Sequence, residues 1–202
     1  NFGTFVPNAF MPPDGVVINP NVDNSILCGD FEVDPGETKV FRIDNTPPPG
    51  GRALTIGFWR NWASCAKSNG KQNPVLDQTL ASFVSGGVYI GNLFVDTCQE
   101  AVRILSKQDV GSGKQKSSDP AFNMAAQLLA AKLNAQAGAG VCPNAATAMV
   151  AGQAILDGAP PSYAVSFTGM GDYPKKGQFA TEANNLATSL DQYNNNYLCV
   201  GP

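Results

Sequence analysis

Apolar and polar positions follow two different periods along this chain, and the period changes near residue 53. Residues 31–43 alternate apolar and polar side chains on both sides of Asp34-Pro35-Gly36, which is typical of a β-hairpin with one buried face. From residue 53 onward the apolar residues recur at helical spacing. The pattern therefore predicts an α+β protein, with a small N-terminal β module (hairpin plus extended arm) over residues 1–52 and a mainly α-helical domain over residues 53–202.

The segments ahead of the hairpin are short, apolar and separated by prolines. Because proline cannot donate to a strand ladder, such segments fit edge strands or an extended arm better than central strands. Two interpretations stay open: the arm packs on its own domain, or it adds a strand to a neighbouring subunit, as in donor-strand assembly. In the second case the subunit interface would contain Phe2, Phe5, Val6, Phe10, Val16, Val17 and Ile18.

The clearest helix in the second region follows Asp119, the expected N-cap, with Pro120 at the first helical position. Its apolar stripe is wide, and Gly138 is expected to end it. The other expected elements are a helix capped by Thr55, a helix from Pro74 to Phe83, a short strand at Val88 to Ile90, a helix from Leu93 to Lys107, a helix from Pro143 to Leu156, and a last helix from Gln178 that ends in Asn194-Asn195-Asn196.

The five cysteines are far apart, form no C-x-x-C pair and have no histidine beside them, because the chain contains none. A zinc site is therefore not expected, and redox catalysis would need a closer pair or an activated thiol. Disulfide bonds made in an oxidising compartment are the better interpretation, and they would brace the helical domain. The spacing does not determine which cysteines pair, and two bridges would leave one of the five cysteines over. The candidates are Cys28, Cys65, Cys98, Cys142 and Cys199.

Composition narrows the range of partners. Charged residues make up only 14% of the chain and the net charge is −3, so the basic surface that nucleic acid requires is not expected. No apolar run reaches the roughly 20 residues of a membrane span. The chain begins at Asn1 with no signal-peptide pattern, which we interpret as a mature extracellular or cell-surface protein after signal peptide removal. A lightly charged surface also suits a homo-oligomer or homopolymer.

Catalytic patterns are sparse. Without histidine, a Ser-His-Asp or Cys-His device is excluded, and the glycine-rich run at 111–118 does not match a P-loop. A pair of carboxylates acting as a glycosidase stays formally open. Neither a cofactor nor a metal is expected, although Asp191, Asn194 and Asn195 offer oxygen ligands for calcium; the simpler interpretation is a helix end closed by asparagine side chains. We therefore expect a protein that is not an enzyme.

Both tryptophans of the chain lie in the run from Thr55 to Trp62. Phe58, Trp59 and Trp62 fall within about one and a half helical turns, so they are either core and interface anchors or a platform on which a sugar stacks. A glycan-binding surface would use exposed aromatic residues such as Trp62, Tyr163 or Tyr173.

Three blocks of residues resemble a domain that recurs in secreted and cell-surface proteins of bacteria and archaea. The family's motifs are T-x-G-Y/F-W-K-x-H, then L-L-A-A-K-L-N, then L-D-x-Y-N-N-G, in that order. The matching residues are Thr55, Gly57, Phe58, Trp59 and Arg60 in the first block, Leu128 to Asn134 in the second, and Leu190, Asp191, Tyr193, Asn194 and Asn195 in the third.

The resemblance implies an extracellular structural role beside repeat and adhesion modules, with no established chemistry. Three positions depart from the motifs: Arg60 stands for Lys, Trp62 for His, and Asn196 for Gly. The second change removes the one plausible base or metal ligand, and the third is mild because asparagine tolerates left-handed backbone geometry. We expect a non-catalytic structural protein, a subunit of a surface appendage or filament that assembles partly through its N-terminal arm. The alternative is a carbohydrate-binding adhesion module.

Overall fold

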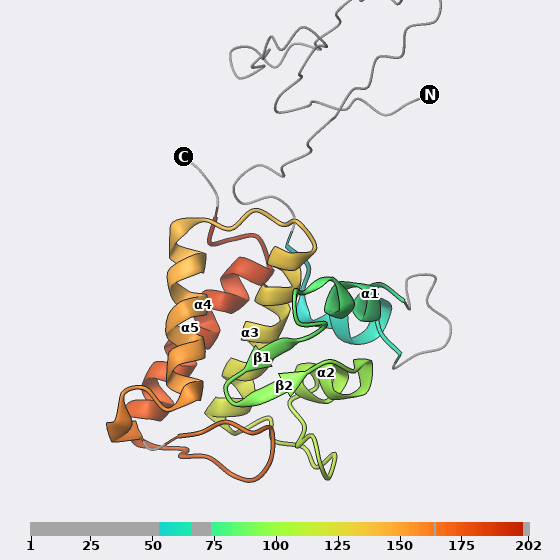
Figure 1. Cartoon of the computed structure of the whole chain (residues 1–202). Coiled ribbons are helices and arrows are strands. Elements are labelled where there is room, and N and C mark those ends of the chain that lie inside the picture. The colour runs from blue at the N-terminus through green and yellow to red at the C-terminus, as the bar shows by residue number, and fades with distance from the viewer. Residues whose placement is uncertain (1–52, 66–73, 164, 200–202) are drawn as a thin grey trace, which may run out of the picture. The chain divides into compact units, whose positions relative to one another are not determined.

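The computed structural model describes residues 53–65, 74–163 and 165–199, all within one compact unit, Pro47–Pro202. These residues form a mainly helical domain with one two-stranded antiparallel sheet (Figure 1). No helix in the described ranges has both the length and the apolar character needed to cross a membrane. In chain order the elements are the π-helix η1 (Phe58–Trp62), α1 (Val75–Ser82), β1 (Val88–Ile90), β2 (Leu93–Val95), α2 (Cys98–Leu105), α3 (Pro120–Gln136), α4 (Pro143–Asp157), the 3-10 helix η2 (Pro161–Tyr163) and α5 (Gly177–Asn194).

The predicted N-terminal β module, residues 1–52, lies outside the described residues, and so does the boundary predicted between the two regions. The same holds for Cys28 and for the candidate interface residues Phe2, Phe5, Val6, Phe10, Val16, Val17 and Ile18. The prediction of a mainly helical second region is confirmed.

Helix α3 is the centre of the domain. It begins as expected, with the Asp119 side chain accepting a hydrogen bond from Ala121 N at 3.0 Å and Pro120 in the first turn. Thirteen of its seventeen residues are buried, so it is covered on nearly every side rather than along one stripe. In Figure 1, α4 and α5 lie on one side of α3, and α1, α2 and the β1–β2 hairpin lie on the other.

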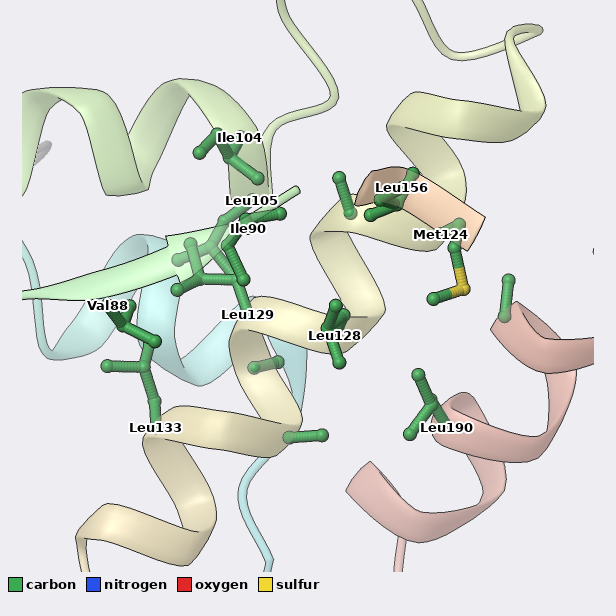
Figure 2. Packing of buried hydrophobic residues seen from close by; sticks show 14 of the residues in the cluster. Val88, Ile90, Ile104, Leu105, Met124, Leu128, Leu129, Leu133, Leu156 and Leu190 are labelled. Carbon is green, nitrogen blue, oxygen red and sulfur yellow. The ribbon is translucent and has the colours of Figure 1, made fainter. Parts of the chain in front are cut away.

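The core fills both sides of α3 (Figure 2). Leu129 and Leu133 point toward Val88 and Ile90 of β1, whereas Leu128 lies on the side of α5. All of the leucines that α3 contributes are fully buried, and burying one leucine stabilises the folded state by about 1.5–3 kcal/mol. Alanines fill half of the remaining buried positions of α3, and small side chains let the neighbouring helices approach closely.

The segment from Leu93 to Lys107, predicted as one helix, is instead a strand followed by a helix. β1 and β2 pair with Ile90 opposite Leu93, which leaves Gly91 and Asn92 as a two-residue turn. Gly91 has a φ of 56°, the left-handed geometry that favours glycine at the first turn position. Helix α2 begins only after Thr97, whose hydroxyl oxygen accepts from Glu100 N at 3.3 Å and donates to the Glu100 carboxylate at 2.8 Å. The T-x-x-E capping signature sets this helix start, and the prediction missed it.

Two disulfide bonds brace the domain, as the sequence predicts. Cys65–Cys98 joins the end of the η1 segment to the start of α2, and Cys142–Cys199 joins the start of α4 to the segment after α5. Their separations along the chain are 33 and 57 residues, and each bridge of this kind stabilises a fold by about 2–4 kcal/mol, largely by constraining the unfolded chain.

Candidate functional site

The aromatic run lies on η1, and its three candidate residues differ sharply in exposure. Trp59 is fully buried, Phe58 is half-buried with its ring edge-on to Trp59 at a centroid distance of 5.4 Å, and Trp62 is 66% exposed. Thr55 caps the run, because its Oγ1 accepts a hydrogen bond from Phe58 N at 3.2 Å. Trp59 therefore anchors the core, and Trp62 presents an aromatic surface to solvent.

Asn134, the last residue of the second motif block, connects this run to the core. Its Oδ1 accepts from Trp59 Nε1 at 2.9 Å and from Leu54 N at 2.8 Å. Its Nδ2 donates to Leu54 O at 2.8 Å and to Asn194 Oδ1 at 2.9 Å. One buried amide thus makes all four hydrogen bonds that its two atoms can form.

The network continues through Asn194 into the third motif block. Asn194 Nδ2 donates to the main-chain oxygen of Gln127 at 3.1 Å and to its Oε1 at 2.8 Å. Gln127 Nε2 in turn donates to Asp191 Oδ1 at 2.7 Å. Residues from all three blocks therefore meet in one chain of hydrogen bonds, most of which is shielded from water.

Asn196 makes a second clamp on the same incoming segment. Its Oδ1 accepts from Ala53 N at 2.7 Å, and its Nδ2 donates to Ala53 O at 2.9 Å. Asn134 and Asn196 therefore pair with the main chain of two successive residues, as a neighbouring strand would. Asn196 has a φ of 62°, so it adopts the left-handed geometry that the glycine of the motif would favour and adds a clamp that glycine lacks. We call Gln127, Asn134, Asn194, Asn196 and the main chain of Ala53 and Leu54 the motif junction.

No family model, curated protein or solved structure matches this chain. The resemblance in the three motif blocks accordingly remains a prediction from sequence, and the geometry of the motif junction has to be interpreted from its own contacts.

The residues considered for calcium are committed to hydrogen bonds. Asn194 points into the motif junction, while Asn195 Nδ2 donates to the main-chain oxygen of Asp191 at 2.8 Å and to its Oδ1 at 3.2 Å. Asn194 and Asp191 each also hydrogen-bond the side-chain amide of Gln127. Within the described ranges, no three or more Cys, Asp or Glu side chains are grouped so that they could hold a metal ion.

The other aromatic candidates for glycan binding are less accessible than Trp62. Tyr163 is buried, and its hydroxyl donates to the Glu182 carboxylate, a hydrogen bond that raises the pKa of the phenol. Tyr173 is half-buried against the rings of Phe122 and Phe167, with centroid distances of 5.7 and 5.2 Å. Of the three nominated aromatic residues, Trp62 alone is well exposed.

Lys116 and three aspartates tie the loop before α3 to the loop that follows η2. Lys116 is 8% exposed, and its Nζ contacts Asp172 Oδ1 at 2.7 Å. Asp109 Oδ2 accepts from Gly171 N at 2.8 Å, and Asp119 Oδ2 accepts from Tyr173 N at 3.0 Å. The hydrogen bond to Asp172, together with the charges of Asp109 and Asp119, raises the pKa of Lys116. Lys116 is thus the cation of this cluster, and the contacts of the four side chains connect the two loops.

A second partly buried lysine, Lys132 of α3, has a different setting. Its Nζ donates to the main-chain oxygen of Tyr89 at 2.8 Å and to Gln153 Oε1 at 2.6 Å, both neutral acceptors. Burial lowers its pKa to about 8, and the charge of Asp157 offsets part of that effect. The side chain lies at a surface pocket of about 430 Å³. The pocket is lined by Lys132, Met149, Val150, Gln153, Ala154 and Asp157.

The sequence pattern did not reveal the motif junction or the Lys132 pocket. Gln127, Lys132 and Asn134 interrupt the apolar pattern of α3, and such interruptions are usually assigned to the solvent side of a helix. The sequence feature that could have revealed both sites is the width of the apolar stripe of α3. A helix that is apolar on nearly every side has no solvent face, so its polar residues must find partners inside the fold.

Proposed function

We propose that this protein is a non-catalytic extracellular structural protein whose helical domain is a braced, self-contained unit. The observation that supports this most is the motif junction, because Trp59, Asn134 and Asn194, one from each motif block, use their side-chain polar groups in buried hydrogen bonds within the fold. A catalytic or binding site would instead leave some of these groups facing a cleft. The two disulfide bonds add support, since such bonds persist in oxidising environments outside the cytosol.

The position of the motif junction suits a structural role. It fastens the main chain at Ala53 and Leu54 to α3 and to the end of α5, so the segment that enters the domain is held beside the segment that leaves it. The Cys142–Cys199 bond secures the outgoing segment to α4. A pulling force applied to either segment would therefore act on these hydrogen bonds and on this disulfide bond before it acted on the apolar core.

This proposal is tested by locating the native protein and by pulling on the domain. We expect surface fractions of the producing cells to contain the protein with both disulfide bonds oxidised. In single-molecule force measurements, Asn196→Ala is expected to lower the unfolding force, whereas the exposed control Asn185→Ala is not. A cytosolic location with reduced cysteines would contradict the extracellular role, and an unchanged force would contradict the role of the clamp.

Assembly into an appendage or filament through the N-terminal arm is part of the proposal and rests on the sequence pattern. Deletion of residues 1–20 is expected to abolish polymers seen by electron microscopy or sedimentation. Assembly that survives this deletion would rule out strand donation by the arm, while the helical domain keeps its structural role.

The second candidate function is a carbohydrate-binding adhesion module, favoured by the exposed indole of Trp62. Aromatic rings exposed in this way can stack on sugar rings. A glycan array should then show binding that Trp62→Ala removes, whereas the buried Trp59 cannot serve such a role. An array without binding to the native protein would exclude this function.

A further inference from the structure

The pocket beside Lys132 combines features of a site for a covalent ligand. All of its lining residues except Lys132 come from one face of α4. Met149, Val150 and Ala154 make this face largely apolar, and Asp157 supplies a charge. An amine at an apolar surface of this kind can react with a small neutral molecule that fits over the apolar side chains.

The hydrogen bonds of Lys132 orient its amine. An ammonium group has three donors, and two of them are used by Tyr89 O and Gln153 Oε1. When the third proton is lost, the two remaining N–H groups can keep these acceptors. The lone pair then takes the third direction, at a side chain that lines the pocket.

Gln153 is itself held in position. Its Nε2 donates to Gly91 O at 3.2 Å and to Asp157 Oδ1 at 2.8 Å, so Oε1 is the atom turned toward Lys132. Asp157 is exposed and lines the same pocket, where its carboxylate can exchange protons with a bound molecule. The amine, the amide and the carboxylate thus form a connected series.

We propose that Lys132 is a nucleophilic lysine that captures small neutral aldehydes in this pocket as reversible imines. The Nζ lone pair attacks the aldehyde carbon, and the carbonyl electron pair moves to oxygen to give a carbinolamine. Asp157 accepts a proton from nitrogen and returns one to the hydroxyl group. Water then leaves as the C=N bond forms, so one amine and one aldehyde give one imine and one water.

The environment keeps the amine reactive near neutral pH. Lysine nucleophiles are commonly activated by desolvation, and burial acts in this direction on Lys132. The ionisable side chains on the elements around it are Asp157 of α4 and Tyr89 of β1, and the contact from Tyr89 is its main-chain oxygen. A negative charge at the pocket also disfavours anionic ligands, which is why the inferred ligand is neutral.

The test is reductive trapping with butanal and cyanoborohydride on the full chain with its disulfide bonds intact, followed by peptide mapping. At pH 7.5 the neutral fraction of an amine with a pKa of about 8 exceeds that of an ordinary lysine by on the order of a hundredfold. A less basic amine is also a weaker nucleophile, which offsets part of this advantage. We expect Lys132 to be alkylated at least about tenfold faster than the exposed Lys175 and Lys176, with the ratio shrinking as the pH rises toward 10.5.

The matched variant is Val150→Asp, which adds a charge at an exposed pocket residue without disturbing the core. It is expected to slow the labelling of Lys132 and leave that of Lys175 unchanged. Labelling of Lys132 no faster than that of the exposed lysines would overturn the proposal. An intact mass showing loss of ammonia before any treatment, with Lys132 joined to Gln153, would also overturn it, because the amine would already be consumed.

Discussion

Asn134 and Lys132 are two positions apart on α3, yet they belong to very different surroundings. Successive residues are rotated by about 100° in an α-helix, so the two side chains leave α3 on nearly opposite sides. Asn134 enters the motif junction, where every polar atom it carries is matched by a protein partner. Lys132 enters a gap between β1 and α4, where its charge is held by neutral oxygen atoms.

The difference shows what a buried polar residue can contribute. A neutral amide with all of its hydrogen bonds satisfied fixes one geometry and gains nothing by changing its protonation state. A partly buried cation without a carboxylate in direct contact is costly in its charged form, so its charge is easily lost. The first arrangement suits a rigid structural joint, whereas the second suits a group that reacts.

The largest expected effect comes from removing the amide of the motif junction. Asn134→Leu would leave Trp59 Nε1, both main-chain groups of Leu54 and the Asn194 side chain without their partner. Since each unsatisfied buried group costs about 1–3 kcal/mol, we expect a loss of about 4 kcal/mol in the free energy of unfolding, measured by chemical denaturation.

The matched control for that variant is Asn185→Ala, because Asn185 is an exposed asparagine on a helix. A change within about 0.5 kcal/mol is expected there. If Asn134→Leu were equally mild, the motif junction would not be a structural joint and the comparison with Lys132 would fail.

The next largest effect is a pH dependence of stability that arises from Lys132. Its pKa is about 8 in the folded protein and 10.5 when unfolded, so the unfolded chain binds more protons between these values. Relative to Lys132→Met, the wild-type protein should therefore gain stability as the pH rises from 8 to 10.5, by at most about 3 kcal/mol. Denaturation curves of both proteins at pH 7, 8, 9 and 10.5 measure this difference, and a flat difference would contradict the lowered pKa.

Much of the fold was predictable from local sequence signals. The two polar sites, the motif junction and the Lys132 pocket, were for the most part not predictable in this way. The Asp119-Pro120 helix start and the expected strand at Val88–Ile90 appear in the structure, because each depends on neighbouring residues. Asn134 and Lys132 gave the same signal, a polar residue in an apolar stripe. Their roles depend on Leu54, Asn194 and Gln153, which lie far away in sequence, so only the folded arrangement distinguishes them.

A smaller effect should follow from altering the second clamp of the motif junction. Asn196→Gly keeps the left-handed backbone geometry, since glycine adopts it readily, but it loses both hydrogen bonds to Ala53. We expect a loss of about 1 kcal/mol, because Ala53 can partly regain partners from water. Asn196→Ala should lose more in the same denaturation experiment, since alanine also strains the backbone at this position. Equal losses in the two variants would mean that the hydrogen bonds, and not the backbone geometry, account for the effect.

The smallest expected effect is a change in the pKa of Lys116, the other buried lysine. The variant that tests it makes the surroundings of Lys116 more like those of Lys132. Asp172→Asn replaces the carboxylate in contact with Lys116 by a neutral amide, so the pKa of Lys116 should fall while that of Lys132 does not change. NMR titration of the lysine side chains measures both values in one sample. Asp109 and Asp119 remain near Lys116, so its pKa should stay above that of Lys132 even in the variant. If the two values converged, burial alone would govern both lysines, and nearby carboxylates would not be what separates a structural cation from a reactive one.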